Sequence, residues 1–276
     1  MNQVTDQQII EILRKEAVPA LGCTEPVACA LACAKCKEVL GGVPERLDVL
    51  VSGNIYKNGM GVGIPGTGMV GLPIAAALGA VCGKSEYGLE VLKEVNVGDN
   101  LQRAKDMLGQ VTVSLKEDAP DKLYAEALAT KGNDTVKVII AHTHTNIVLV
   151  EKNGDEIFKR EFRLDTSKPE DKGPELSVKR IWDFVHEVDV KDIEFVLQGA
   201  EMNKAISAEG LNSEYGLQIG KTLKENIDKG LLEDDLLNRT LIRATAASDA
   251  RMDGCPKPVM TNSGSGNQGI TVYLPV

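Results

Sequence analysis

Hydrophobic positions in the first forty residues recur with a helical period. In residues 5–18 the apolar side chains return every three or four positions, and the threonine and aspartate at the start can cap such a helix. Gly22 interrupts this pattern. A second helix is predicted from Thr24, whose hydroxyl can cap it, to the glycine pair at 41–42.

A strand-like run and a glycine-rich stretch come next. Residues 46–56 have the pattern of a strand, whereas residues 57–71 hold too many glycines for a helix or a strand. That stretch leads into a short apolar helix over 72–81. Two amphipathic helices are then predicted over 85–95 and 99–108.

The middle of the chain changes from helical to extended patterns. Strand-like runs are found at 110–117, 122–130, 135–151 and 156–162. The last two runs are joined through Asn153 and Gly154, a pair that is a strong signal for a tight hairpin. The charged stretch 163–177, which holds two prolines, is interpreted as the connector out of this region.

Helical patterns return in the last third of the chain, over 177–188, 189–210, 214–230 and 233–252. The predicted fold class is therefore α+β, with a helical core built from the first and last thirds and an inserted α/β subdomain that carries an antiparallel sheet. The predicted divisions are residues 1–84 for the helical and glycine-loop part, 85–165 for the insertion, and 166–276 for the second helical part.

Composition and charge narrow the class of protein. The formal net charge of −9 speaks against nucleic acid as a partner, because phosphate binding requires clustered Lys and Arg. No window is long and apolar enough for a membrane span, and the start of the chain lacks a secretion signal. Six cysteines in such a chain are typical of cytoplasmic thiols, so we expect a cytoplasmic protein.

The cysteines near the start fall into two groups. Cys29, Cys33 and Cys36 follow the spacing of a buried helical stripe, which favours a structural role as small hydrophobic side chains over a metal site. Cys23 precedes the predicted helix, where backbone N–H groups favour a thiolate. It is a candidate nucleophile or metal ligand, and a buried thiol remains the alternative.

Two glycine-rich loops offer many hydrogen-bond donors. Residues 63–71 lie before a predicted helix, and residues 262–269 combine glycines with hydroxyl and amide side chains. Neither has the spacing of a P-loop or of a dinucleotide fold. Because no basic cluster accompanies them, they favour a small carboxylate over a polyphosphate as ligand.

Two histidines lie two positions apart in the run 135–151. His142 and His144 would share one face of a strand, where a pair can ligate a metal. A strand histidine is more commonly a hydrogen-bonded surface or core residue, so both interpretations stay open.

Several stretches resemble the L-cysteine desulfidase family, which is related to the alpha part of iron–sulfur L-serine dehydratases. They are AVPALGCTEPVA, YKNGMGVGIPGTGMVGLPIAAALGA, HTNIV, TAASDARM and NSGSGNQGITVYLPV. The resemblance extends from about Val18 to Val276. It implies a β-eliminating lyase with a 4Fe-4S cluster that converts L-cysteine to pyruvate, ammonia and sulfide, with one iron open as a Lewis acid.

The resemblance also assigns candidate site residues. Cys23 is the candidate metal ligand. The resemblance does not identify the proton-abstracting base, and Lys57, His144 and Ser265 are the candidates for this catalytic role. The candidate substrate-binding residues, which would hold the carboxylate and ammonium of the amino acid, are Asn58, Thr67, Gly68, Ser263, Gly264, Ser265, Asn267 and Gln268.

The other cluster cysteines of the family lie beyond the position of Val276, so the resemblance covers an amino-terminal portion only. It implies a missing carboxyl-terminal segment or a companion chain, and we expect this chain to be inactive alone. Exposed apolar surface where that segment docks would favour association, including with a second copy. Three alternatives stay open: an L-serine dehydratase-type deaminase, a pyridoxal-phosphate lyase, and a non-catalytic subunit that binds a small carboxylate.

Overall fold

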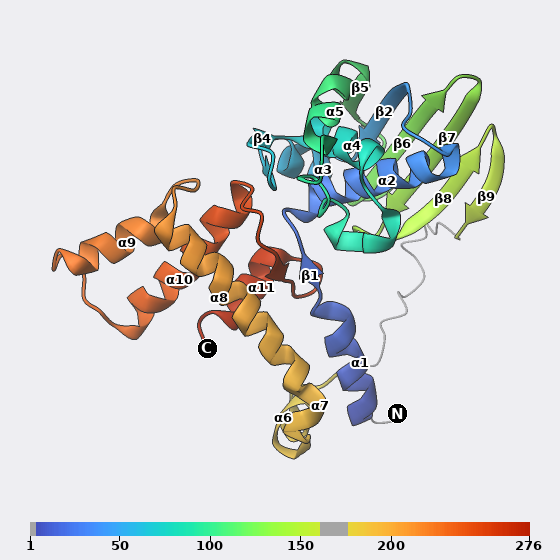
Figure 1. The fold of residues 1–276 in the computed structure, drawn as a ribbon. Helices are drawn as coiled ribbons and strands as arrows, with labels where there is room; N and C mark the ends of the chain where they lie inside the picture. Colours follow the sequence, from blue (N-terminus) through green and yellow to red (C-terminus); the bar gives the residue numbers. More distant parts are fainter. Residues whose placement is uncertain (1–3, 161–175) are drawn as a thin grey trace.

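The computed structural model describes residues 4–160 and 176–276, which form a sheet lobe and a helical lobe (Figure 1). The sheet lobe comprises residues 21–160. The helical lobe combines residues 4–20 with residues 176–276, so both ends of the described chain contribute to it. The mixed architecture confirms the predicted α+β class.

A six-stranded sheet has the order β5-β2-β6-β7-β8-β9. The strands are β2 (Arg46–Val51), β5 (Val111–Leu115), β6 (Tyr124–Lys131), β7 (Asp134–Ala141), β8 (Ile147–Lys152) and β9 (Asp155–Lys159). Strands β6 to β9 are antiparallel, as predicted for the insertion, and the turn from β8 to β9 places Asn153 and Gly154 at positive φ.

Strand β2 comes from the first third of the chain and lies inside this sheet. It pairs parallel with β5 and antiparallel with β6, and it buries Leu47, Val49 and Val51 on one face. The sheet therefore joins residues from two of the predicted divisions. The boundaries at 84 and 165 themselves stay predictions.

The helices of the sheet lobe are α2 (Thr24–Leu40), α3 (Gly53–Gly59), α4 (Leu72–Val81) and α5 (Asn100–Met107), with 3₁₀ turns η1 (Ser85–Glu90) and η2 (Leu108–Gln110). Helix α2 is buried on nearly all sides because it packs on β6 and β7 and also against α4. The α2–α4 contact requires Gly79, since a Cβ there would lie 2.1 Å from the carbonyl oxygen of Ala30. Small side chains thus allow this helix layer to pack closely.

The helical lobe contains α1 (Asp6–Glu16), α6 (Val178–Glu187), α7 (Val190–Ile193), η3 (Glu194–Val196), α8 (Leu197–Asn212), α9 (Ile219–Asp228), α10 (Leu236–Met252) and α11 (Gly266–Tyr273). Ile9 and Ile10 of α1 pack with Phe184 of α6. The short strands β1 (Pro19–Ala20) and β10 (Val259–Met260) pair antiparallel and tie the start of the chain to its last third. Helices from both thirds therefore pack together.

Several local predictions differ from the structure. Helix α1 has the predicted cap at Thr5, but Cys23 and not Thr24 is the N-cap of α2. Residues 53–59 form α3, where a strand was predicted to continue. Residues 85–90 form a 3₁₀ helix instead of an amphipathic α-helix, because Gly88 adopts a positive φ that interrupts the helical backbone.

The run 135–151 is two strands and not one. His142 adopts φ 69°, and the Asn146 side chain donates a hydrogen bond to the carbonyl oxygen of Ala141, which closes a turn between β7 and β8. His142 and His144 therefore lie in a turn and do not share a strand face. The predicted connector 163–177 falls almost wholly outside the described residues. Within the described ranges, no helix combines the length and apolarity needed to cross a membrane.

Candidate active site

A cavity of about 350 Å³ lies where the two lobes meet. It is lined by Cys23, Thr24, Glu25, Asn58, His144, Arg251, Met252, Ser263, Gly264, Ser265 and Asn267. The start of α2, helix α3 and the β7–β8 turn contribute from the sheet lobe. The end of α10 and the loop before α11 contribute from the helical lobe, so the fold assembles the cavity from five separate segments.

Two helices begin at this cavity. Cys23 is the N-cap of α2, and Ser265 is the N-cap of α11, where its hydroxyl accepts a hydrogen bond from the backbone N–H of Gln268 at 3.2 Å. The first turn of a helix leaves backbone N–H groups without helical partners and carries partial positive charge. Two such ends at one cavity favour an anionic group there.

Glu25 is held at the cavity by three hydrogen bonds, of which the longest, at 3.4 Å, comes from the Thr24 hydroxyl to its Oε2 atom. The thiol of Cys23 donates to its Oε2 atom at 2.8 Å, and Nδ2 of Asn58 donates to its Oε1 atom at 3.2 Å. Burial alone would raise the pKa of Glu25, but these hydrogen bonds outweigh it and lower that pKa below its ordinary value. The cavity therefore contains a carboxylate at neutral pH.

Cys23 is only 8% exposed, and burial raises its pKa to about 11. The nearby positive charge of Arg251 opposes this shift, and the charge of Glu25 adds to it. The predicted position of Cys23 at a helix start is confirmed, but the predicted thiolate is not. Desolvation and the Glu25 carboxylate keep the thiol protonated at neutral pH.

Arg251 is buried at the end of α10 and donates to two oxygen acceptors, besides a longer contact of 3.8 Å from Nη1 to the sulfur of Met252. Its Nη1 atom donates to Oδ1 of Asn267 at 2.9 Å, and its Nη2 atom donates to the carbonyl oxygen of Gly22, also at 2.9 Å. Among the described residues its buried Nε–H has no acceptor. Burial lowers the pKa of Arg251, while Cys23 and Glu25 oppose that shift, and an arginine keeps its charge in proteins.

The backbone around Arg251 leaves no room for larger residues. A Cβ at Gly266 would lie 2.5 Å from the Nε atom of Arg251. A Cβ at Gly22, which also has a positive φ of 79°, would lie 2.8 Å from the Pro65 ring. Gly266 therefore leaves room for the guanidinium, and Gly22 leaves room for the Pro65 ring.

His144 is half-buried in the β7–β8 turn. Burial lowers its pKa below the ordinary value, Arg251 lowers it further, and Glu25 partly offsets both effects. The imidazole is therefore neutral at neutral pH, and a neutral imidazole can accept a proton.

The structure brings together most of the predicted site residues. Cys23, Asn58, His144, Ser263, Gly264, Ser265 and Asn267 all line the cavity. Lys57, Thr67, Gly68 and Gln268 do not. Lys57 is exposed on α3, and Gln268 is exposed on α11.

The loop that carries Thr67 and Gly68 forms a hairpin of strands β3 (Gly63–Ile64) and β4 (Met69–Val70). The Thr67 hydroxyl donates to the carbonyl oxygen of Ile64 at 2.7 Å and accepts from the backbone N–H of Met69 at 2.9 Å. These contacts stabilise the hairpin, and its Pro65 ring lies against Gly22.

Sequence reasoning did not assign roles to Glu25 and Arg251. Both lie within stretches that carry the family resemblance, GCTEP and TAASDARM. Their position in these stretches is the sequence feature that could have identified them as site residues. Their opposite charges meet only after the chain has folded, because they lie on helices α2 and α10 of different lobes.

The described residues do not hold an iron–sulfur cluster by themselves. Cys23 is the cavity's single cysteine among them. Cys29, Cys33 and Cys36 are completely buried along α2, and Cys82 and Cys255 are buried as well. Within the described ranges no group of three His, Cys, Asp or Glu side chains is placed to hold a metal ion. A cluster needs several thiolates, so one thiol does not fit it.

Comparison with known proteins assigns the chain to a family. The family model described as "Serine dehydratase alpha chain" matches residues 86–276. The chain belongs to the serine dehydratase alpha chain family. The match includes the segments that contribute His144, Arg251 and the loop before α11 to the cavity.

Relatives of this chain are longer. It is 48% identical over 273 residues to a "UPF0597 protein" of Actinobacillus pleuropneumoniae serotype 3 (strain JL03), a match that covers 98% of this chain and 63% of that protein. It is 46% identical over 282 residues to a "UPF0597 protein" of Parabacteroides distasonis, which covers 100% of this chain and 65% of that protein. The chain thus spans less than two thirds of the length of these relatives. No solved structure matches it.

Proposed function

We propose that this chain is the amino-acid-binding part of a β-eliminating lyase, with L-cysteine as substrate and pyruvate, ammonia and sulfide as products. One observation carries the proposal. The carboxylate of Glu25, the guanidinium of Arg251 and the starts of α2 and α11 converge on one cavity of about 350 Å³. That arrangement is complementary to a small zwitterion.

Each charged group has a role in this proposal. The carboxylate of the amino acid lies at the start of α11, where free N–H groups and the charge of Arg251 favour an anion. The ammonium lies beside Glu25, whose lowered pKa keeps it ionised. Neutral His144 accepts the proton that leaves the α-carbon, and the Ser265 hydroxyl lies at the same cavity.

An iron–sulfur cluster would supply a Lewis-acid iron for the leaving group in such a lyase. The described residues offer one thiol for it, so the remaining ligands would come from polypeptide that this chain does not contain. The steps assigned here to Glu25, Arg251 and His144 do not depend on where those ligands lie.

Two other candidates are supported by particular observations. The family description favours L-serine, whose elimination releases water in place of sulfide. The cavity lining has one cysteine among the described residues, which is too few for an iron–sulfur cluster. This favours a subunit that binds a small amino acid without turnover. A pyridoxal-phosphate lyase is less favoured, since no lysine lies among the described residues of the cavity lining to form a Schiff base.

Calorimetry on the full chain tests the binding part of the proposal. L-Cysteine and L-serine are titrated into the unchanged chain and into Glu25→Gln and Arg251→Lys. Lys57→Ala is the matched control, because Lys57 lies beside Asn58 but outside the cavity lining. We expect binding that weakens about tenfold or more in the first two variants only, as for loss of a charged contact. Absence of binding, or equal binding by all variants, would contradict it.

Turnover is tested separately. The chain is reconstituted anaerobically with iron and sulfide, alone and with the remaining polypeptide of a relative, and then given each amino acid. Pyruvate with sulfide identifies a desulfidase, and pyruvate from L-serine identifies a dehydratase. Turnover by the chain alone would refute the expectation that it needs further polypeptide, and binding without turnover in both samples would favour the non-catalytic subunit.

A further inference from the structure

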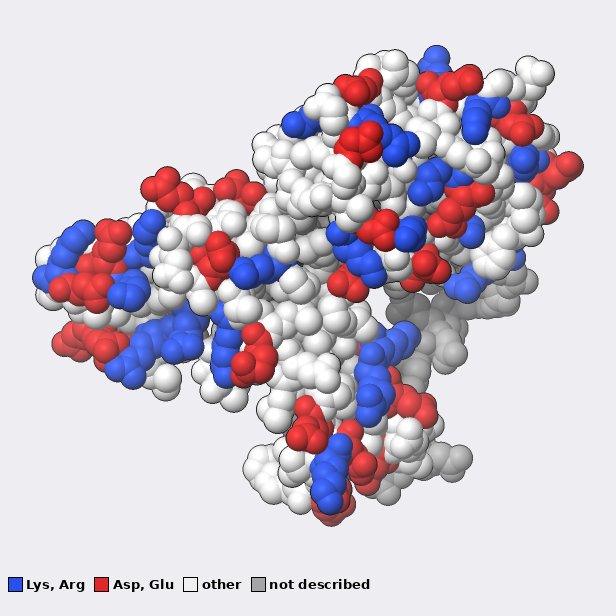
Figure 2. Space-filling view, in the orientation of Figure 1, with Lys and Arg blue, Asp and Glu red and all other residues white. Residues whose placement is uncertain are grey.

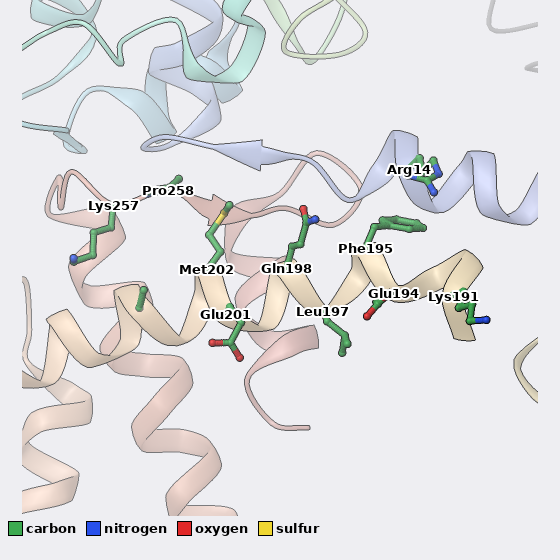
Figure 3. A pocket seen from close by; sticks show the side chains of 11 residues that line it. Arg14, Lys191, Glu194, Phe195, Leu197, Gln198, Glu201, Met202, Lys257 and Pro258 are labelled. Carbon is green, nitrogen blue, oxygen red and sulfur yellow. The ribbon is translucent and has the colours of Figure 1, made fainter. Parts of the chain in front are cut away.

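Most of the exposed large hydrophobic side chains of the described residues lie in the helical lobe. Leu197, at the start of α8, is 61% exposed and lines two hollows. The first hollow, of about 890 Å³, lies between α1 and α8. In Figure 3, Gln198 and Met202 point from α8 toward β1, whereas Leu197 and Glu201 point away from it. Leu197 therefore forms the ridge between the hollows.

The second hollow, of about 660 Å³, is formed by α8, α10 and the end of α11. Its apolar lining includes Leu236, which is 78% exposed, and Val272, which is 48% exposed. Uncharged surface continues over the middle of the helical lobe in Figure 2, with charged side chains of both signs at its edge. The second hollow thus exposes several large apolar side chains next to one another, and such a group is typical of a surface that another protein covers.

The charged side chains at the second hollow have one sign. Lys204, Arg239 and Arg243 line it, no Asp or Glu is among its described lining residues, and the carboxylate of the terminal Val276 is its one negative group there. Lys204 pairs with Glu201, and Arg239 pairs with Asp234. Among the described residues, the Arg243 side chain has no ion-pair or hydrogen-bond partner, so it is the cation most available to an incoming carboxylate.

We propose that both hollows and the Leu197 ridge are an interface for the part of the family's polypeptide that has no counterpart in this chain. More than a third of the length of the relatives is unmatched, so they contain additional polypeptide that could cover this face. Its apolar side chains fill the hollows, and its acidic side chains meet Arg243 and the two neighbouring cations. This inference is independent of the reaction proposed above.

Co-expression tests this interface. The full chain is produced with the unmatched part of the Actinobacillus pleuropneumoniae relative as a separate, tagged polypeptide. Complex formation is measured by co-purification and light scattering, and hydrogen exchange locates the protected segments. We expect a one-to-one complex with protection in α8 and α10.

Variants give the test its specificity. Leu197→Glu and Leu236→Glu place charge in the interface and are expected to weaken the complex at least tenfold, and Arg243→Glu is expected to weaken it less and mainly at low salt. Leu217→Glu and Leu231→Glu are matched controls, since these leucines are 81% and 71% exposed and lie outside both hollows.

Three results would overturn the proposal. The first is that no complex forms with the unchanged chain. The second is that the control variants weaken the complex as much as Leu197→Glu does. The third is that the chain alone forms a dimer that Leu197→Glu dissociates, because a second copy would then be the occupant.

Discussion

Residues 63–71 and residues 262–269 are both rich in glycine and hydrogen-bond donors, yet they use those donors differently. In the first loop the Thr67 hydroxyl bonds within the β3–β4 hairpin, to Ile64 and Met69, and the Gly66 N–H donates to the carbonyl oxygen of Gly254. The second loop lines the cavity with Ser263, Gly264, Ser265 and Asn267. The same composition thus supports an internal turn in one place and the lining of a cavity in the other.

The two loops are nevertheless connected through Arg251. A Cβ at Gly63 would lie 2.4 Å from the backbone of Asp253, so the first loop packs directly against the end of α10. The second loop contacts the guanidinium itself through Asn267. The first loop positions the backbone that carries Arg251, and the second positions its side chain. In both loops glycine allows the backbone to pack closely against another segment, whereas only the second loop lines the cavity.

The largest expected effect comes from Gly266→Ala. The added Cβ would lie 2.5 Å from Nε of Arg251 and would displace the guanidinium. We expect amino-acid affinity to fall about 100-fold, with overpacking that costs about 1–3 kcal/mol of unfolding free energy. Calorimetry and thermal unfolding measure both. Gly61→Ala is the control, because nothing lies within 4 Å of its Cβ. Unchanged affinity in Gly266→Ala would contradict the role given to Arg251.

A smaller effect is expected from a matched pair of hydroxyl deletions. Ser265→Ala removes the N-cap of α11, and Thr67→Val removes the bonds inside the hairpin. Each is expected to lower the unfolding free energy by about 1 kcal/mol. Ser265→Ala should also weaken amino-acid binding several-fold, whereas Thr67→Val should leave it unchanged. Weaker binding in Thr67→Val would show that the first loop contributes to the site directly.

Gly264→Ala and Gly68→Ala compare backbone strain in the two loops. Both glycines have a positive φ, 75° and 64°, and neither has an atom within 4 Å of the added Cβ. Each substitution is expected to cost about 1 kcal/mol, because an L-residue is disfavoured in this conformation. Urea unfolding measures the cost. Affinity should fall only in Gly264→Ala, and a fall in both variants would remove the distinction between the loops.

The smallest effect concerns the protonation of Cys23, which faces the second loop. Its pKa in the folded chain, about 11, exceeds the ordinary value of 9.0. Because the pKa of Cys23 is higher in the folded chain than in the unfolded chain, the protonated thiol contributes to the unfolding free energy. That contribution is complete below about pH 9 and is lost as the pH rises toward 11. Unfolding free energy should therefore fall over this interval, and less steeply in Cys23→Ala.

Alkylation gives a second measurement of the same group. Modification of Cys23 by iodoacetamide should accelerate up to about pH 11, because the thiolate is the reactive form. An alkylation rate that is already maximal at pH 8 would contradict this prediction. It would mean that the helix start and Arg251 lower the pKa of Cys23 by more than burial raises it.

Local features could be predicted because their causes are local. The cap at Thr5, the Asn153-Gly154 turn and the stop of α2 at Gly41 each depend on residues within a few positions. The position of Cys23 at a helix start followed for the same reason. The turn at His142 was missed because the polar residues 142–146 were taken as part of a strand that joins the apolar runs of β7 and β8.

What the sequence by itself determined is most of the helices and strands, the α+β class and the segments that carry the family resemblance, because periodicity and turn chemistry act over short distances. Only the tertiary structure decided which groups meet. It placed Glu25 and Arg251 at one cavity, kept the Cys23 thiol protonated through burial, and left Thr67 inside a hairpin. Desolvation and charge pairing depend on neighbours that lie far away along the chain, and those neighbours are known only once the lobes have packed.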